Sequence, residues 1–254
     1  MKRKATRLTA TAALGLAIVW SGGAPAAAAE PLPGGLVRLR EVAPDILQDM
    51  RYAGPFNFTG APVPGYRAAE CILWRPAAQA LARAQARLAA EGYRLKVWDC
   101  YRPVRAVKAF AEWAKAPGRD EMKPVFYPAL EKSRLFALGY IATRSKHSLG
   151  IAVDLGLVRL DDPPLPTPAG GGACDGPFEG RARESSLDLG TAFDCFSDTS
   201  ATARRDIPPA ARANRDRLLR ALVREGFTNY DQEWWHFEYH APGAPTEPFD
   251  VPVE

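Results

Sequence analysis

The chain has 254 residues, of which 47% are hydrophobic and 24% are charged, as in ordinary globular proteins. Its formal net charge of +4 comes entirely from residues 1–29, which contain four basic and no acidic side chains. The remaining 225 residues have a net charge of zero, which argues against a nucleic-acid-binding protein, since such proteins present a basic face.

The first 29 residues have the layout of a secretory signal peptide. A basic start, MKRK, is followed by an apolar run from Leu8 to Trp20 and by small residues that end near Ala29. A retained membrane anchor is the alternative, but threonines interrupt this run, and it is shorter than the roughly 20 apolar residues that span a bilayer. We therefore expect residues 1–29 to direct export and to be removed, leaving residues 30–254 as one exported domain without membrane attachment.

Two helices and a strand are predicted next along the chain. Residues 76–91, PAAQALARAQARLAAE, combine strong helix formers with Pro76 at the start and Gly92 just after the end. The following segment, YRLKVWDC, is typical of a strand. Apolar residues then recur at helical spacing from Val104 to Ala114, so we expect Arg102 at a strand-to-helix junction, where side chains commonly point into a cleft.

The C-terminal half begins with an irregular region, since residues 161–186 are dense in Pro and Gly and predict a long surface loop. A helix is predicted from residue 209 to residue 226, with the arginines between residues 204 and 224 on its solvated side. Its buried face is expected to contain Leu218, Leu219, Leu222 and Val223. Residues 227–239, FTNYDQEWWHFEY, are expected to form one core strand. This mixed order predicts a single α+β domain with a central, mainly antiparallel sheet flanked by helices.

Four cysteines form an even set, which favours disulfide bonds in an exported protein. Sequence alone permits three pairings. We favour Cys71 with Cys100 and Cys174 with Cys195, because the second bond would close a loop that has little other means of ordering itself. A four-cysteine zinc site is the alternative reading, but no C-x-x-C spacing occurs.

The segment SKHSLGIAVDL, residues 145–155, could bring a histidine and a carboxylate together. Ser148 to Gly150 read as a turn, and the apolar residues that alternate after it would face the core, which places Asp154 on the opposite face. Small residues leave room over that face, so His147 could fold back above Asp154. A structural hydrogen bond between the two side chains is the alternative to a metal site.

A second segment, EWWHFEY, contains another histidine and another carboxylate. Glu233 and His236 are three residues apart and would face opposite ways in a regular strand, so they act together only if the strand starts irregularly. In that case His147, Asp154 and His236 could bind one zinc ion and leave a fourth position open, as in catalytic zinc sites. The alternative is that the aromatic residues belong to the core and Glu233 is solvated.

Together these segments resemble a known family. Residues 145–154 fit S-x-H-x-x-G-x-A-x-D and residues 233–236 fit E-x-W-H, the two signatures of the zinc D,D-peptidases of family M15, whose fold is hedgehog-like. Three further segments resemble the D-alanyl-D-alanine dipeptidases of the vancomycin-resistance type: MRYAGPFNFTG at 50–60, VWDCYRPVRAV at 97–107 and LGTAFDCF at 189–196. The resemblance extends from about residue 45 to residue 240.

The resemblance implies a role for each residue of the two signatures. His147, Asp154 and His236 would be the ligands of one zinc ion, and Glu233 would be the general base. An activated water at such a site could hydrolyse a peptide bond.

The other similar segments imply a substrate pocket. Arg102 would stabilise the negative oxygen that develops on the scissile carbonyl, and Asp194 would bind the free ammonium of the substrate, with Tyr52 and Ser145 lining the pocket. The chain departs from the family pattern at Cys100, where Gly is common, and in the longer loop at 161–186.

The sequence therefore favours an exported zinc dipeptidase that cleaves the small dipeptide D-alanyl-D-alanine. A D,D-carboxypeptidase or endopeptidase acting on peptidoglycan stem peptides is the nearest alternative, because it would use the same metal site. A non-catalytic zinc module that binds wall peptides is an alternative of another class. Glu233 and Arg102 argue against it, because a binding module needs neither a base nor an oxyanion donor.

Overall fold

The computed structural model describes residues 32–254, and the expected export signal, residues 1–29, lies outside them. The helices are α1 (Leu39–Val42), α2 (Arg75–Ala90), α3 (Val104–Lys115), α4 (Lys123–Phe126) and α5 (Pro209–Val223). The strands are β1 (Leu36–Arg38), β2 (Leu47–Gln48), β3 (Ile72–Trp74), β4 (Tyr93–Asp99), β5 (Ala152–Arg159), β6 (Phe227–Asn229) and β7 (His236–Tyr239). None of the helices in the described range is long and apolar enough to cross a membrane.

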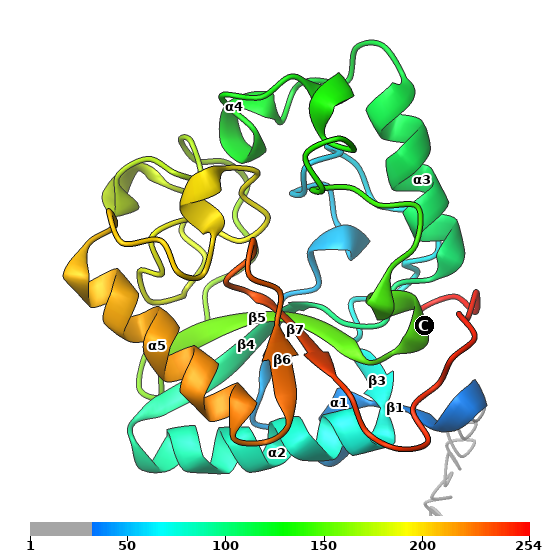
Figure 1. Ribbon diagram of the computed structural model, residues 1–254. Helices are drawn as coiled ribbons and strands as arrows, with labels where there is room; N and C mark the ends of the chain where they lie inside the picture. Colours follow the sequence, from blue (N-terminus) through cyan, green and yellow to red (C-terminus); the bar gives the residue numbers. More distant parts are fainter. Residues whose placement is uncertain (1–31) are drawn as a thin grey trace, which may run out of the picture. The chain divides into compact units, whose positions relative to one another are not determined.

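A five-stranded sheet organises the fold in the order β2-β4-β5-β7-β6. Only the β2–β4 pair is parallel, and a separate antiparallel pair joins β1 to β3. Helices α2 and α5 pack on one side of the sheet, whereas α3, α4 and the long loops lie on the other (Figure 1). The expected α+β architecture with a mainly antiparallel sheet is confirmed.

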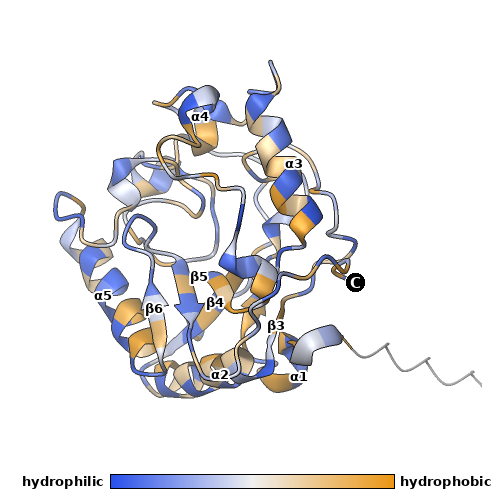
Figure 2. Cartoon of the chain, turned by 45° about the vertical axis from the view of Figure 1, so that its right-hand side comes forward, coloured by the Kyte–Doolittle hydropathy of each residue, from blue (hydrophilic) through white to orange (hydrophobic). Residues whose placement is uncertain are grey.

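The core lies on both faces of the two central strands. Every residue of β5 except Arg159 is buried, and β4 is buried from Leu95 onward, because helices cover one face and loops the other. Hydrophobic residues gather in these strands, while α3 and α5 show hydrophilic residues on their outer sides (Figure 2). The face of β5 that holds Asp154 is therefore as buried as its apolar face.

The expectation of a single strand over residues 227–239 is wrong. The segment is a hairpin, in which β6 and β7 flank a turn. The Asn229 side chain stabilises this turn, since its amide donates to the carbonyl oxygens of Glu233 at 3.0 Å and His236 at 2.8 Å. A polar turn thus interrupts a run whose composition is β-prone throughout.

Helix α5 also differs from the expectation at two positions. Val223 is 51% exposed, because it is the last residue of the helix. Arg215 is only 2% exposed, although the arginines of this region are expected in solvent. Its guanidinium donates to the carbonyl oxygens of Leu189, Thr199 and Ala201, so it helps to link α5 to the chain around these residues.

Both favoured disulfides are present in the structure. Cys71–Cys100 joins the residue before β3 to the residue after β4, and Cys174–Cys195 joins the long loop to a segment near the sheet. Residues 161–186 are irregular apart from one 3-10 turn at Phe178–Gly180, as the sequence predicts.

Candidate active site

Three predicted ligands meet at the ends of the central strands. The Nε2 atom of His147 lies 3.1 Å from Nδ1 of His236 and 3.3 Å from Oδ1 of Asp154, and the last two atoms are 3.0 Å apart. Strand register explains part of this, because Asp154 of β5 pairs directly with His236 of β7. His147 comes from the 3-10 turn that precedes β5.

The turn before β5 explains the spacing of its motif. The hydroxyl of Ser145 accepts a hydrogen bond from the backbone N–H of His147 at 3.2 Å, which starts the turn. Gly150 ends it with a φ of +70°, a conformation that favours glycine, and a Cβ there would lie 2.3 Å from Leu36. The turn therefore brings His147 back over the strand, as the sequence predicts.

Hydrogen bonds on the far side of each ring leave the correct nitrogen free for a metal. The Nδ1–H of His147 donates to the carbonyl oxygen of Cys100 at 2.6 Å, so its Nε2 presents a lone pair to the cluster. The Nε2 of His236 lies 3.5 Å from a carboxylate oxygen of Glu238. Such outer partners orient metal-binding histidines. Sequence reasoning missed Glu238, although its spacing of two from His236 on a strand places both on one face.

The three facing atoms fit a divalent metal. Tetrahedral zinc ligands at about 2.0–2.1 Å from the ion lie about 3.3 Å from one another, close to the separations of 3.0–3.3 Å present here. Burial alone would raise the pKa of Asp154, but the two histidines lower it, so its carboxylate is ionised. Burial opposes the charged form of His236, yet in the metal-free protein its ring N–H groups donate to the carboxylates of Asp154 and Glu238, which raises its pKa to about 10. The cluster thus favours a positive charge at its centre.

We call His147, Asp154 and His236 the ligand cluster. The candidate residues outside it all line the same pocket, which has a volume of about 220 Å³. They are Tyr52, Arg102, Ser145, Asp194 and Glu233. The structure therefore brings together residues from five separate segments of the chain, including every residue for which the sequence predicts a catalytic, metal or substrate-binding role.

Glu233 reaches the pocket through a turn that precedes β7. The backbone N–H of His236 donates to the carbonyl oxygen of Glu233 at 3.1 Å, so the strand starts irregularly, as the sequence requires for both side chains to act together. Burial raises the pKa of the Glu233 carboxyl to about 7, with His236 opposing and Asp154 reinforcing the shift.

Arg102 is held in place beside the ligand cluster. Its Nε donates to Asp99 at 2.9 Å, its guanidinium lies 5.2 Å and 5.1 Å from the ring centres of Tyr52 and Phe110, and its Nη2 is 3.6 Å from Asp154. The strand-to-helix position expected for Arg102 is confirmed, because β4 ends at Asp99 and α3 begins at Val104.

Asp99 is a functional candidate that sequence reasoning missed. Its carboxylate accepts hydrogen bonds from Arg102 and from the Tyr66 hydroxyl at 2.6 Å, and it lies 3.4 Å from Nδ1 of His147. It is fully buried. A carboxylate at the end of the strand that leads to Arg102, three residues before that arginine, is the signal that could have identified it.

Asp194 lies on the other side of the pocket. One of its carboxylate oxygens accepts a hydrogen bond from the Tyr52 hydroxyl at 2.7 Å. Burial raises the pKa of Asp194 well above its usual value, and the negative charge of Asp154 adds to this effect. A cation that enters the pocket would favour the ionised carboxylate.

Comparison with known proteins places the chain in a family. The D-ala-D-ala dipeptidase model of peptidase family M15 matches residues 33–175 and 166–254. The chain is similar to a D-alanyl-D-alanine dipeptidase of Enterococcus faecium, with 33% identity over 87% of this chain and 98% of the relative. Enzymes with the same name from Streptomyces coelicolor and Escherichia coli are 35% and 29% identical, over 84% and 80% of this chain and 95% and 83% of their own lengths. This chain therefore belongs to the D-ala-D-ala dipeptidase family, peptidase M15.

Proposed function

We propose that this protein is a zinc-dependent dipeptidase that hydrolyses D-alanyl-D-alanine to two molecules of D-alanine. Its relatives are named for that activity, and peptidase family M15 is metal-dependent. The observation that carries the proposal is one small pocket that combines the cluster of His147, Asp154 and His236 with a buried carboxylate, Asp194. Three protein ligands leave a fourth position open, as in catalytic rather than structural zinc sites.

We assign the proton transfers of the reaction to Glu233. A zinc ion at the cluster would act as a Lewis acid and lower the pKa of the attacking water. The carboxylate of Glu233 takes a proton from the water that attacks the amide carbon, and passes a proton to the leaving amine as the C–N bond breaks. A pKa of about 7, which results from its burial, suits a group that must both accept and donate a proton near neutral pH.

Arg102 stabilises the negative charge that develops on the carbonyl oxygen. Its guanidinium stays charged at any relevant pH and is fixed in place by Asp99 and by two aromatic rings. Because this donor is already in position before the reaction, it does not reorganise as negative charge develops. Such preorganisation is the main source of oxyanion stabilisation.

Asp194 selects substrates that have a free amino terminus. A buried carboxylate is stable in its charged form only beside a cation, and the ammonium of a dipeptide supplies one. Tyr52 orients the carboxylate by its hydrogen bond, and Ser145 completes the pocket wall. An acylated stem peptide lacks this ammonium, so the same pocket disfavours the carboxypeptidase and endopeptidase alternatives.

The decisive experiment combines metal analysis of the purified protein with hydrolysis assays on two substrates. We expect one zinc ion per chain and a strong preference for D-alanyl-D-alanine over its N-acetyl derivative. Faster hydrolysis of the acetylated peptide would contradict the dipeptidase assignment. A protein that binds zinc and both peptides without cleaving either would instead support a binding module.

We also propose that the protein is exported, with residues 1–29 as a cleaved signal and residues 30–254 as the catalytic domain. Two disulfides support this, since disulfides persist in oxidising compartments. Amino-terminal sequencing of the protein recovered outside the producing cells tests the proposal. We expect the chain to start near residue 30, and recovery of the intact amino terminus would contradict cleavage.

A further inference from the structure

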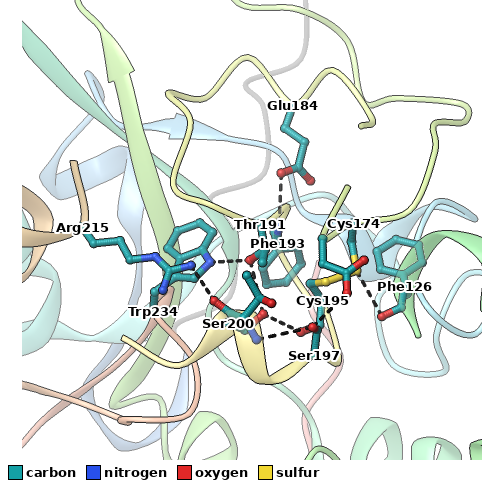
Figure 3. The surroundings of a disulfide bond; sticks show 12 residues. Phe126, Cys174, Glu184, Thr191, Phe193, Cys195, Ser197, Ser200, Arg215 and Trp234 are labelled. Atoms are coloured by element: carbon teal, nitrogen blue, oxygen red, sulfur yellow. Dashed lines mark hydrogen bonds between the residues drawn. A yellow bond between two sulfur atoms is a disulfide. The ribbon is translucent and has the colours of Figure 1, made fainter. Parts of the chain in front are cut away.

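The segment Leu189–Phe196 is buried although it forms no helix or strand. Asp194, near its end, has a φ of +61°, a left-handed backbone conformation that few residues other than glycine adopt. Such a conformation persists only where the surrounding structure holds it. Figure 3 shows the contacts around this segment, which come from parts of the chain that are distant in sequence.

One set of contacts centres on the disulfide between Cys195 and Cys174. The carbonyl oxygen of Cys174 accepts a hydrogen bond from the N–H of Ala192 at 2.9 Å, so the bridge and the backbone hold the same loop against the segment. The carbonyl oxygen of Cys195 accepts from the Ser200 hydroxyl at 2.7 Å. Asp194 is therefore fixed from its C-terminal side.

A second set of contacts centres on Glu184 from the long loop. One oxygen of its buried carboxylate accepts the backbone N–H of Phe193 at 3.0 Å, as Figure 3 shows. The other oxygen lies 3.1 Å from Nη1 of Arg51, which is also fully buried. Asp194 is therefore fixed from its N-terminal side as well.

Glu184 and the carboxylate of Asp194 both contact one short turn. Arg51 and Tyr52 are consecutive in the 3-10 turn Arg51–Ala53: the first contacts Glu184, and the second donates to the carboxylate of Asp194. Glu184 therefore contacts both the backbone of residue 193 and the turn that presents the Tyr52 hydroxyl to Asp194.

We propose that the Cys174–Cys195 disulfide and Glu184 are positioning groups for substrate recognition. Together they hold the carboxylate of Asp194 where it meets the free ammonium of the dipeptide. This inference rests on the function proposed above, in which Asp194 binds that ammonium. A disulfide and a loop residue thus have a role in specificity, although they touch neither the ligand cluster nor the reacting bond.

The first test is the double variant Cys174→Ser/Cys195→Ser. We expect kcat/KM for D-alanyl-D-alanine to fall about 10- to 100-fold, mainly through KM, because a displacement of about 1 Å can weaken catalysis on that scale. Zinc content should not change, and hydrolysis of the N-acetyl derivative should fall much less than that of the free dipeptide, since the acetylated amine makes no ion pair with Asp194. An equal fall for both substrates would indicate general loosening and overturn the proposal.

The second test changes Glu184 and does not depend on the folding of the cysteine variant. Glu184→Ala should reduce the preference for the free dipeptide, and Glu184→Gln should restore part of it, because the amide oxygen still accepts the N–H of Phe193 although the amide NH2 cannot accept from Arg51. Glu225→Ala is the matched control: it removes a buried carboxylate paired with Arg83 and Arg87, away from the pocket. This control should leave the preference unchanged.

The variant Asp194→Asn separates failure of this inference from failure of the proposed function. If Asp194→Asn keeps the wild-type preference for the free dipeptide, the ammonium-binding role itself is wrong. If Asp194→Asn abolishes the preference but neither Glu184→Ala nor the cysteine variant reduces it, only the positioning role is wrong. A reduced preference in all three variants supports both.

Discussion

The two sides of the pocket are built in different ways. On the metal side, Asp154 and His236 face each other from adjacent strands, and His147 is supplied by a short turn that leads into one of them. On the ammonium side, Asp194 comes from an irregular segment that is held by a disulfide and by side chains distant in sequence. Rigid strands suit ligands that must lie about 2 Å from one ion, whereas loops more often carry the groups that set specificity.

Each side has its own disulfide. The carbonyl oxygen of Cys100 accepts the Nδ1–H of His147, so the Cys71–Cys100 bridge supports a proposed metal ligand. The Cys174–Cys195 bridge lies next to Asp194 in the chain. The comparison implies that changes on the metal side alter metal binding and turnover, whereas changes on the ammonium side alter which substrate is preferred.

The variant His147→Ala should give the largest loss. Changes to groups that only orient a metal ligand lower metal affinity or activity about 10- to 100-fold. Removal of a ligand itself should therefore reduce kcat/KM by more than about 1000-fold. Zinc content, measured on the dialysed protein together with the rate, should fall well below one ion per chain. A His147→Ala protein with full zinc content would contradict the assignment of His147 as a metal ligand.

The variant Glu233→Ala should keep zinc but lose turnover. Removal of a general acid and base typically lowers kcat by about 100- to 10,000-fold, while the three ligand atoms stay in place. Parallel measurement of zinc and kcat separates this outcome from that of His147→Ala. A near-normal rate would end the assignment of Glu233 as the base.

The variant Arg102→Ala should lower kcat by about 100- to 1000-fold, as expected for the loss of an oxyanion donor. Arg102→Lys should recover little, because an ammonium cannot reproduce the bonds of a guanidinium to Asp99 or its stacking between two rings. An effect confined to KM would place Arg102 in ground-state binding instead.

The variant Cys71→Ser/Cys100→Ser should have the smallest effect on the rate. It is the counterpart, on the metal side, of Cys174→Ser/Cys195→Ser. Because it loosens the carbonyl that orients His147, we expect zinc affinity to fall about 10- to 100-fold, and with saturating zinc the rate should approach the wild-type value. The ratio of rates for free and acetylated dipeptide should not change. A changed ratio would show that the two disulfides are not specialised.

Each half of the metal side has a local pattern, and the resemblance to the two family signatures joined the halves, although Asp154 and His236 are 82 residues apart. The spacing of His147, Gly150 and Asp154 encodes a turn followed by a strand. An irregular start was the condition for Glu233 and His236 to act together, and the structure has it. The sheet and the longer helices follow from periodicity and from Pro and Gly at their ends.

Other features could not be predicted, either because their partners are distant in sequence or because no pattern of residue types marks them. Arg215 is buried only because three carbonyl oxygens from an irregular segment accept its hydrogen bonds. Glu184 is one of several charged residues in a Pro- and Gly-rich loop, and no local pattern distinguishes it. The turn of the β6–β7 hairpin depends on Asn229, whose side chain bonds two carbonyl oxygens further along the chain.

The two disulfides have a practical consequence for preparing the enzyme. Reducing compartments keep cysteines as thiols, so protein produced in a bacterial cytosol would fold without either bridge. Such material could contain zinc after reconstitution and still bind its dipeptide poorly, and an assay would then understate both its affinity and its selectivity. Production through an oxidising secretory route is therefore the appropriate starting point for kinetic work.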